Sequence, residues 1–163
     1  MSLKAKVTDA AAPLDAFGFR WDAETEILAG RVDLPEEDSG FTGSWELESH
    51  GGAVVTLETV SGVLCGIEVV VWPEVDEPAR LVPPHDAAPG RVILEPPDRN
   101  AKGLIEIETP ISAFAREDVV HFVFAPARAR TVRVAENVLA DLDSAGHLTG
   151  VWLVDVPPYP QGG

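Results

Sequence analysis

The chain has 163 residues, 45% of them hydrophobic, and carries 27 acidic against 12 basic side chains, a net charge of −15. This length suits one ordinary domain or two very small ones, with enough apolar residues to build a core. The negative charge repels phosphate, so we expect neither nucleic acid nor a membrane as partner, whereas a basic protein is compatible with it.

The chain contains one cysteine, Cys65, which excludes an internal disulfide and fits a reducing compartment. The opening residues lack the apolar centre of a signal peptide, and no apolar run is long enough to span a bilayer. We therefore expect a cytoplasmic protein. Residues 1–16 are predicted to be an N-terminal extension ahead of the first patterned segment.

Apolar and polar side chains alternate with a period of two in the first half, which predicts β-strands. The predicted strands cover residues 17–21, 27–34, 45–48, 53–58 and 63–72. Paired glycines at 51–52 suit a tight hairpin. These strands form a first β repeat, residues 17–73. Residues 74–90 are rich in proline, which cannot donate to a sheet ladder, and are predicted to be a connector.

The second half follows the same plan and is predicted to be a second β repeat over residues 91–157. Its predicted strands cover residues 91–96, 103–110, 119–126, 131–135, 138–143 and 147–156. The segment "ISAFARED", residues 111–118, has no counterpart in the first half and is expected to form one helical turn. Residues 158–163 are expected to be a loose tail.

The closing strands of the two halves share a sequence pattern. "GVLCGIEVVVWPE" and "GHLTGVWLVDVPP" correspond at an offset of 84 residues, which predicts an internal duplication. Each copy is too small to be stable alone. The sequence therefore predicts an all-β fold in which two antiparallel meander halves pack as one sandwich or barrel-like domain about an internal pseudo-two-fold axis.

Strand parity makes a more detailed prediction for these closing strands. Leu64 and Leu148 are expected to be equivalent core residues, each on the face that also carries Val70 or Val154. The glycine that interrupts each strand two residues later is expected to mark a β-bulge or a close approach of backbones.

Two stretches, "WDAETEILAGRVDL" and "LDSAGHLTGVWLVDV", resemble the opening and closing segments of a family of short bacterial β-strand-rich proteins of unknown function. The family's closing motif is D-x-D-x-x-G-x-L-x-G-I-E. The first repeat keeps its last three residues as Gly66, Ile67 and Glu68, while the second has Trp152 in place of the glutamate. The resemblance implies a β fold and no accepted activity, and some members are thought to accompany toxin-like neighbours.

The segment "DLDSAG" partly matches a calcium-binding loop, which needs oxygen ligands at positions 1, 3 and 5 and a glutamate at position 12. Asp141, Asp143 and Gly146 fit the pattern, but Ala145 and Trp152 do not. The segment is therefore interpreted as an acidic β-turn whose glycine takes a positive φ. We predict no metal site and no cofactor.

Acidic residues recur two positions apart, a spacing that projects both from one face of a strand. The pairs are Glu24 and Glu26, Glu46 and Glu48, Glu106 and Glu108, and Asp141 and Asp143. Glycosidases use paired carboxylates, but apolar residues lie between most of these. We interpret the pairs as solvated faces of half-buried strands.

The four histidines lack metal-ligand spacing. His50 and His147 are expected in turns and His85 in the connector. His121 lies within "VVHFVF" and is expected to be partly buried and hydrogen-bonded. Cys65 has no adjacent base and is expected to be a buried, unreactive thiol.

The sequence contains no nucleophile elbow, phosphate loop or dinucleotide fingerprint. The leading hypothesis is therefore a non-enzymatic module that associates with itself or with a basic protein. The alternative is a small-molecule-binding protein or hydrolase with an interior cavity. Its candidate ligand-binding residues are Trp45, Trp72, Trp152 and Glu68. A broad exposed surface would favour the first, and a pocket with converging polar groups the second.

Overall fold

The computed structural model describes residues 3–98 and 100–160, and over these residues the protein is all-β, as predicted, with no helix. Its strands are β1 (Leu3–Asp9), β2 (Arg20–Asp22), β3 (Ile27–Arg31), β4 (Gly43–Glu48), β5 (Val54–Val60), β6 (Val63–Val71), β7 (Val75–Asp76), β8 (Ala88–Leu94), β9 (Gly103–Glu108), β10 (Ser112–Arg116), β11 (Val119–Val123), β12 (Arg130–Ala135), β13 (Val138–Leu142) and β14 (His147–Leu153).

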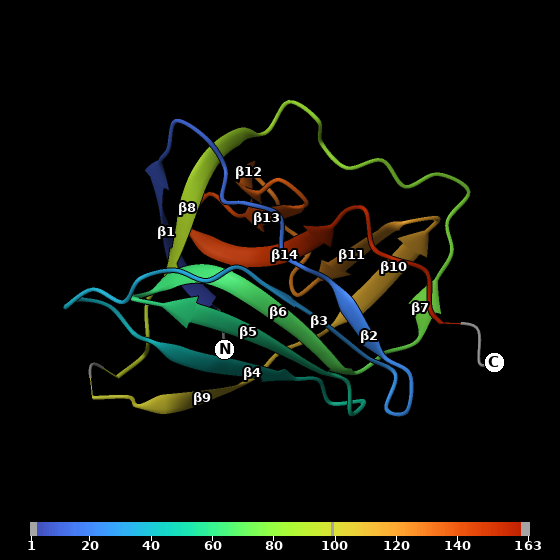
Figure 1. Ribbon diagram of the computed structural model, residues 1–163, viewed down its shortest axis with the longest axis horizontal. Helices are drawn as coiled ribbons and strands as arrows, with labels where there is room; N and C mark the ends of the chain where they lie inside the picture. The colour runs from blue at the N-terminus through green and yellow to red at the C-terminus, as the bar shows by residue number, and fades with distance from the viewer. Residues whose placement is uncertain (1–2, 99, 161–163) are drawn as a thin grey trace.

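The strands form two facing layers, which Figure 1 shows one above the other. The lower layer has the order β2-β3-β6-β5-β4-β9, and the upper layer has the order β7-β10-β11-β14-β13-β12-β8. Most neighbours are antiparallel, as expected for meanders, but β4–β9, β8–β12 and β7–β10 are parallel. The layers meet where Val63 of β6 pairs with Ile93 of β8.

The N-terminal segment closes part of the upper layer into a barrel. Leu3 and Lys4 of β1 pair with β14, and the rest of β1, from Ala5 to Asp9, pairs with β8. Because β8 also pairs with β12, the strands β14, β13, β12, β8 and β1 form a closed ring. Residues 3–9, expected in an extension, are therefore part of the barrel wall.

Two further segments differ from the sequence-based expectation. Residues 111–118 do not form a helical turn, because Ser112–Arg116 is strand β10 and pairs with β11. The connector is not wholly outside the sheets either, since it contains β7 and the first residues of β8. β7 pairs with β10, and the start of β8 pairs with β12, so both strands of the connector have partners that are distant in sequence. This tertiary pairing overrides the weak local β signal of the connector.

The order of strands is the same in the two halves. The first half has β2-β3-β6-β5-β4 and the second has β10-β11-β14-β13-β12, each followed by a parallel neighbour, β9 or β8. The turn glycines Gly62 and Gly146 precede the closing strands and have φ values of 83° and 85°. The duplication itself stays a prediction, to be tested by superposing the halves.

Both closing strands contain a β-bulge beside their glycine. In β5–β6 the pairing shifts between Gly66 and Leu64, and Cys65 is the extra residue. In β13–β14 it shifts between Gly150 and Leu148, and the extra residue is Thr149. The bulges expected at these glycines are therefore confirmed.

The bulges also correct the face predicted for the two leucines. Leu64 and Leu148 are buried, at 1% and 2% exposure, in the core between the layers. However, Leu64 does not share its environment with Val70, which is only half-buried, and Val154 belongs to a separate apolar cluster. One extra residue reverses the alternation, so strand parity counted across the bulge fails.

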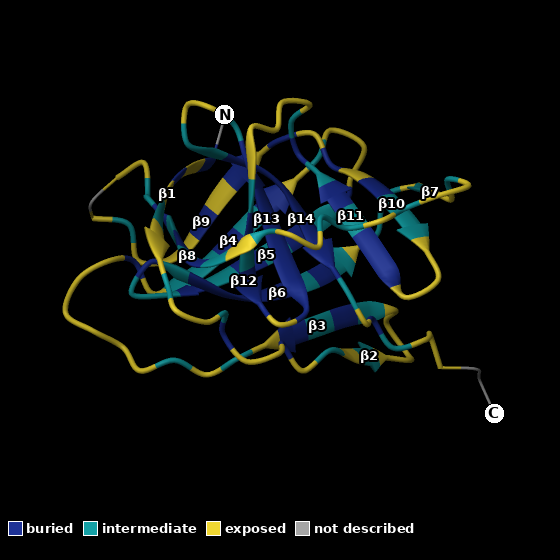
Figure 2. Ribbon diagram, turned by 90° about the horizontal axis from the view of Figure 1, so that it is seen from above, coloured by how far each residue is buried: buried dark blue, intermediate teal, exposed yellow. Residues whose placement is uncertain are grey.

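The core draws on both layers and both halves of the chain. Figure 2 shows buried residues concentrated on the central strands and exposed residues in the loops. The main cluster joins Leu57 and Val69 of the lower layer with Phe122 and Val151 of the upper layer. Because one apolar cluster spans both halves, the protein should unfold as a single unit.

We expect either Leu64→Ala or Leu148→Ala to lower the free energy of unfolding by about 2–5 kcal/mol, through lost transfer energy and a residual cavity. Each variant should still unfold in one transition in urea, because both leucines lie in the shared cluster. Two separated transitions in either variant would contradict the single core.

The bulge residue of the second half leaves a polar atom without a partner. The Thr149 hydroxyl is buried and has no hydrogen-bond partner among the described residues. At the equivalent bulge, the Cys65 thiol lies 3.7 Å from the carbonyl oxygen of Glu58. A buried hydroxyl that loses its bonds to water lowers stability by about 1–3 kcal/mol.

Thr149→Val should therefore raise the free energy of unfolding by about 1 kcal/mol, since it removes the unpaired hydroxyl and keeps the side-chain shape. Thr149→Ser is the matched control: it retains the hydroxyl, loses a methyl group and should be less stable than the native protein. Urea denaturation measures both. A valine variant less stable than the native protein would show that the hydroxyl is hydrogen-bonded in solution.

Candidate functional site

The residues proposed to line an interior cavity do not converge. The Trp45 indole is buried and donates to the Thr59 hydroxyl at 3.1 Å. Trp152 belongs to the outer side of the upper layer, where it packs with Val119 and Leu139. Glu68 is half-buried on β6 of the lower layer. The structure therefore places these candidates in separate environments.

Trp72 alone of the four lines the groove that is also bounded by His50 and Pro110, but its ring already packs against other aromatic rings. One neighbour is Trp21, stacked at 5.6 Å between ring centroids, and another is Phe122 at 5.7 Å. Its indole N–H donates to the carbonyl oxygen of Glu26 at 3.0 Å. Trp72 thus supports the groove as packing and offers a ligand neither a free N–H nor an open stacking platform.

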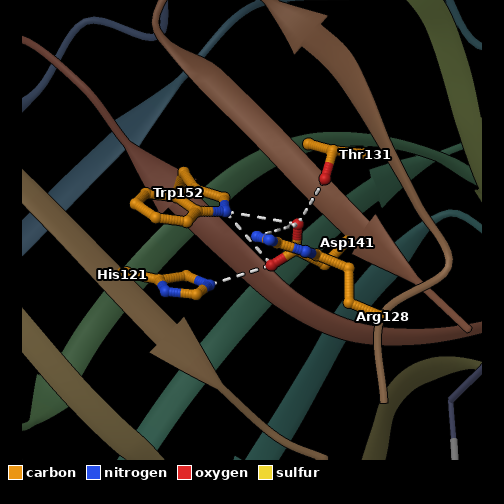
Figure 3. Close-up of polar contacts among 5 residues, drawn as sticks. All are labelled: His121, Arg128, Thr131, Asp141 and Trp152. Atoms are coloured by element: carbon orange, nitrogen blue, oxygen red, sulfur yellow. Dashed lines mark hydrogen bonds and ion pairs between the residues drawn. The ribbon is translucent and has the colours of Figure 1, made fainter. Parts of the chain in front are cut away.

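A polar network buried beneath the connector surrounds the carboxylate of Asp141, which Figure 3 shows in detail. His121 Nε2 lies 2.8 Å from one carboxylate oxygen, and the Thr131 hydroxyl donates to the other at 2.8 Å. The Trp152 indole N–H donates to the same group at 3.1–3.2 Å. Arg128 lies 3.9 Å away. Asp141 itself is 2% exposed.

The network depends on Gly150 of β14, because β14 lies between β11, which carries His121, and β13, which carries Asp141. His121 on β11 is the pairing partner of Trp152 on β14, and their rings stack at 3.7 Å. Asp141 on β13 is the partner of Gly150 on β14. A Cβ at position 150 would lie 2.7 Å from the Phe122 carbonyl oxygen and 3.0 Å from the Asp141 carboxylate. Glycine therefore allows His121 to reach Asp141 across β14.

The environment of Asp141 contradicts the sequence-based prediction, whereas that of His121 confirms it. The residue was expected on a solvated strand face, but it is a buried charge whose partners come from three other strands. His121 is half-buried and hydrogen-bonded, as expected. The sequence signal that could have located the network was Gly150. It indicated that other atoms approach the backbone closely at this position, but it did not identify His121 and Asp141 as those neighbours.

The protonation state of Asp141 follows from these bonds. Burial acts to raise the pKa of this carboxyl, but hydrogen bonds from His121, Thr131 and Trp152, with the charge of His121, outweigh it and lower the pKa. The carboxylate is thus ionised, and its oxygens are held by protein donors. Leu81 of the connector packs on the same cluster as Trp152. The network fixes four neighbouring strands beneath this cover.

The lowered pKa of Asp141 predicts that the protein loses stability in acid. The stability contributed by ionised Asp141 is fully present above its unfolded pKa of about 3.9 and is lost as pH falls through the lower folded value. Asp141→Asn should cost about 1.5–3 kcal/mol at neutral pH, and its deficit relative to the native protein should shrink below about pH 4.

Urea denaturation across pH measures this deficit. The exposed Asp38, changed to Asn, is the matched control and should cost little stability because its side chain is exposed in a loop. A deficit for Asp141→Asn that stays constant down to pH 2 would show that the carboxylate is not ionised in the fold.

The acidic turn in the second half is built as interpreted. Asp143 accepts hydrogen bonds from the backbone N–H groups of Ala145 and His147, at 3.0 and 2.8 Å. Gly146 supplies the positive φ. These bonds lower the pKa of the Asp143 carboxyl, with the His147 backbone bond the largest influence. Over the described ranges, no cluster of three or more His, Cys, Asp or Glu side chains is arranged to hold a metal ion.

Cys65 is a buried free thiol, as expected. Burial is the main cause that raises its pKa, so the protonated, weakly nucleophilic form is favoured. His50 and His85 are exposed, in the β4–β5 hairpin and in the connector.

A surface of four glutamates lies where β4 and β9 run parallel. Glu46 pairs with Glu106, and Glu48 pairs with Glu108, through their Cα positions. All four alternate with buried apolar residues and so face outward. No ion pair found within residues 3–98 and 100–160 involves any of them. We call this surface the acidic face.

The acidic face continues into a groove. A hollow of about 460 Å³ is bounded by the four glutamates with Ser49, His50 and Ile107. It adjoins a larger groove of about 1040 Å³, which shares His50 and Glu108 and is bordered by Trp72, Pro110 and Ile111. The surface thus combines the charged hollow with a larger groove at one end, whose lining includes the apolar side chains of Trp72, Pro110 and Ile111.

No protein-family model matches this chain, and a search of curated proteins gave no match. The described residues form no helix with the length and apolarity of a membrane span. The resemblance of the closing motif to a bacterial β-rich family therefore has no independent support from these comparisons.

Proposed function

We propose that the protein is a non-enzymatic binding module that holds a positively charged segment of a partner protein on its acidic face. The observation that carries this proposal is the in-register pairing of Glu46 with Glu106 and Glu48 with Glu108, with no cationic partner among the described residues. A lysine- or arginine-rich segment supplies the missing charge.

Stability alone does not account for this arrangement. Like charges directly opposite each other on neighbouring strands are destabilising. The buried residues beneath, among them Trp45 and Leu47 of β4 and Ile105 and Ile107 of β9, hold the strands in register. The fold thus supports a repulsive surface, a feature typical of binding sites.

The geometry of the His121–Asp141 pair supports a role outside catalysis. The nearest hydroxyl of the network, on Thr131, donates to Asp141 and forms no bond with His121. A nucleophile activated by histidine would need such a bond. The network therefore favours a structural function, which leaves the acidic face as the stronger candidate.

Binding can be tested with a synthetic peptide that carries lysine at every second position. The variant Glu46→Gln/Glu48→Gln/Glu106→Gln/Glu108→Gln should bind it about tenfold more weakly or worse, because each exposed pair contributes about 0.2–1 kcal/mol. The same variant should melt at a higher temperature, since the like-charge repulsion is gone. Calorimetric titration and thermal unfolding measure the two effects.

A matched control removes four charges elsewhere: Glu24→Gln/Glu36→Gln/Glu37→Gln/Asp38→Asn, all exposed in loops. Both variants carry the same net charge, so long-range attraction changes equally. The control should keep its affinity within about threefold, because these charges lie outside the acidic face and solvent screens them. Equal loss of binding in both variants would contradict a localised site.

A further inference from the structure

We propose that the partner segment binds as an added β-strand along the open edge of β9, with its basic side chains opposite Glu106 and Glu108. This inference rests on the proposed function and specifies how the partner is held. Strand addition to a sheet edge uses main-chain hydrogen bonds for affinity and alternate side chains for specificity.

The edge of β9 is open. Among the described residues its one strand partner is β4, and it ends the order of the lower layer. Figure 1 shows β9 at the outer margin of that layer. Thr109, just after the strand, donates its N–H to the Glu48 carbonyl oxygen at 3.0 Å. Because backbone groups alternate sides along a strand, those of Glu106 and Glu108 point to the open edge.

The open backbone groups and the carboxylates therefore belong to the same residues. Glu106 and Glu108 are both exposed, while Ile105 and Ile107 between them are buried. A strand added here would place every second side chain beside a glutamate, at the roughly 4.5–5.5 Å Cβ separation of cross-strand pairs. Lysine or arginine at alternate positions matches this spacing.

Protection of the edge against aggregation does not explain the whole surface. Charged side chains on an edge strand discourage unwanted pairing, which would account for Glu106 and Glu108. It does not account for Glu46 and Glu48, because β4 is paired on both sides. The second row of carboxylates deepens the negative potential beside the edge and so favours a basic strand over other occupants.

A second copy of this chain is a poor occupant for the same reason. Symmetric pairing of β9 with β9 of another copy would bring the two sets of Glu106 and Glu108 together. Like charges facing each other across strands are unfavourable. The charge pattern therefore selects a different, basic partner.

Apolar features at both ends of β9 provide an independent contribution. Leu104 near its start is 49% exposed, which is unusual for a large apolar side chain here. Its end leads into the larger groove, where Pro110 and Ile111 meet Trp72. A segment of about six residues, the length of β9, would contact Leu104 at one end and enter the groove at the other.

The test uses three acetylated eight-residue peptides of alternating lysine and threonine: one unmodified, one N-methylated at every lysine and one N-methylated at every threonine. Only one set of alternate amides in an added strand bonds to the edge. We expect one methylated peptide to bind about tenfold or more weakly than the other, a loss equivalent to a few hydrogen bonds. Methylated lysines that block binding indicate an antiparallel strand, and methylated threonines a parallel one.

Hydrogen exchange provides the direct readout on the intact protein. The amides of Glu106 and Glu108 should exchange at least about tenfold more slowly with the unmodified peptide bound. The amides of Ile105 and Ile107 already point toward β4 and are the internal control, with little change.

The outcomes separate this inference from the proposed function. If all three peptides bind alike, or both methylated peptides lose affinity equally, strand addition is overturned while charge-based binding stands. If the unmodified peptide does not bind at all, both proposals fail. If the amides of Glu106 and Glu108 are already protected without peptide, and sedimentation shows a dimer, the occupant is a second copy and the inference is overturned.

Discussion

One extra residue beside the glycine of each closing strand determines how the sheets bend and which side chains enter the core. The bulges at Cys65 and Thr149 reverse the alternation, so that Leu64 and Leu148 join the apolar cluster between the layers. The segments just before the bulges then meet new neighbours: Leu148 pairs with Leu3 of β1, and Val63 pairs with Ile93 of β8. Barrel closure and the junction of the layers both depend on these bends.

Negative charges occupy two contrasting environments in this protein, one buried and one at the surface. Asp141 is buried, and donors from His121, Thr131 and Trp152 hold its charge, so it links β13 to three other strands in addition to their backbone bonds and apolar packing. A buried carboxylate that lost these donors would be strongly unfavourable. Among the described residues no donor bonds to the carboxylates of the acidic face, which are half-buried or exposed. The charge of Asp141 is thus satisfied inside the fold, whereas those of the acidic face lie at its surface.

The sequence was sufficient for the fold class and for most strands, because two-residue alternation survives wherever one face is buried. It failed where short or charged segments gain their structure from distant partners. Lysines in "LKAKVTD" concealed β1, whose partners β14 and β8 lie far along the chain. The glutamate pairs were recognised as exposed, but nothing local reveals that β4 and β9 align them in parallel register. The prediction that Asp141 is solvated was wrong because its hydrogen-bond donors come from three other strands, β11, β12 and β14.

The two halves differ in how they use an equivalent edge. In each half the fourth strand of the shared order, β4 or β12, has a parallel neighbour, β9 or β8. The other edge of β8 is covered by β1, and this pairing closes the barrel. No described strand covers the corresponding edge of β9. An open edge invites pairing with other chains unless charge restricts which chains can approach. We propose that the carboxylates of β4 and β9 supply that restriction and make this edge selective for basic strands.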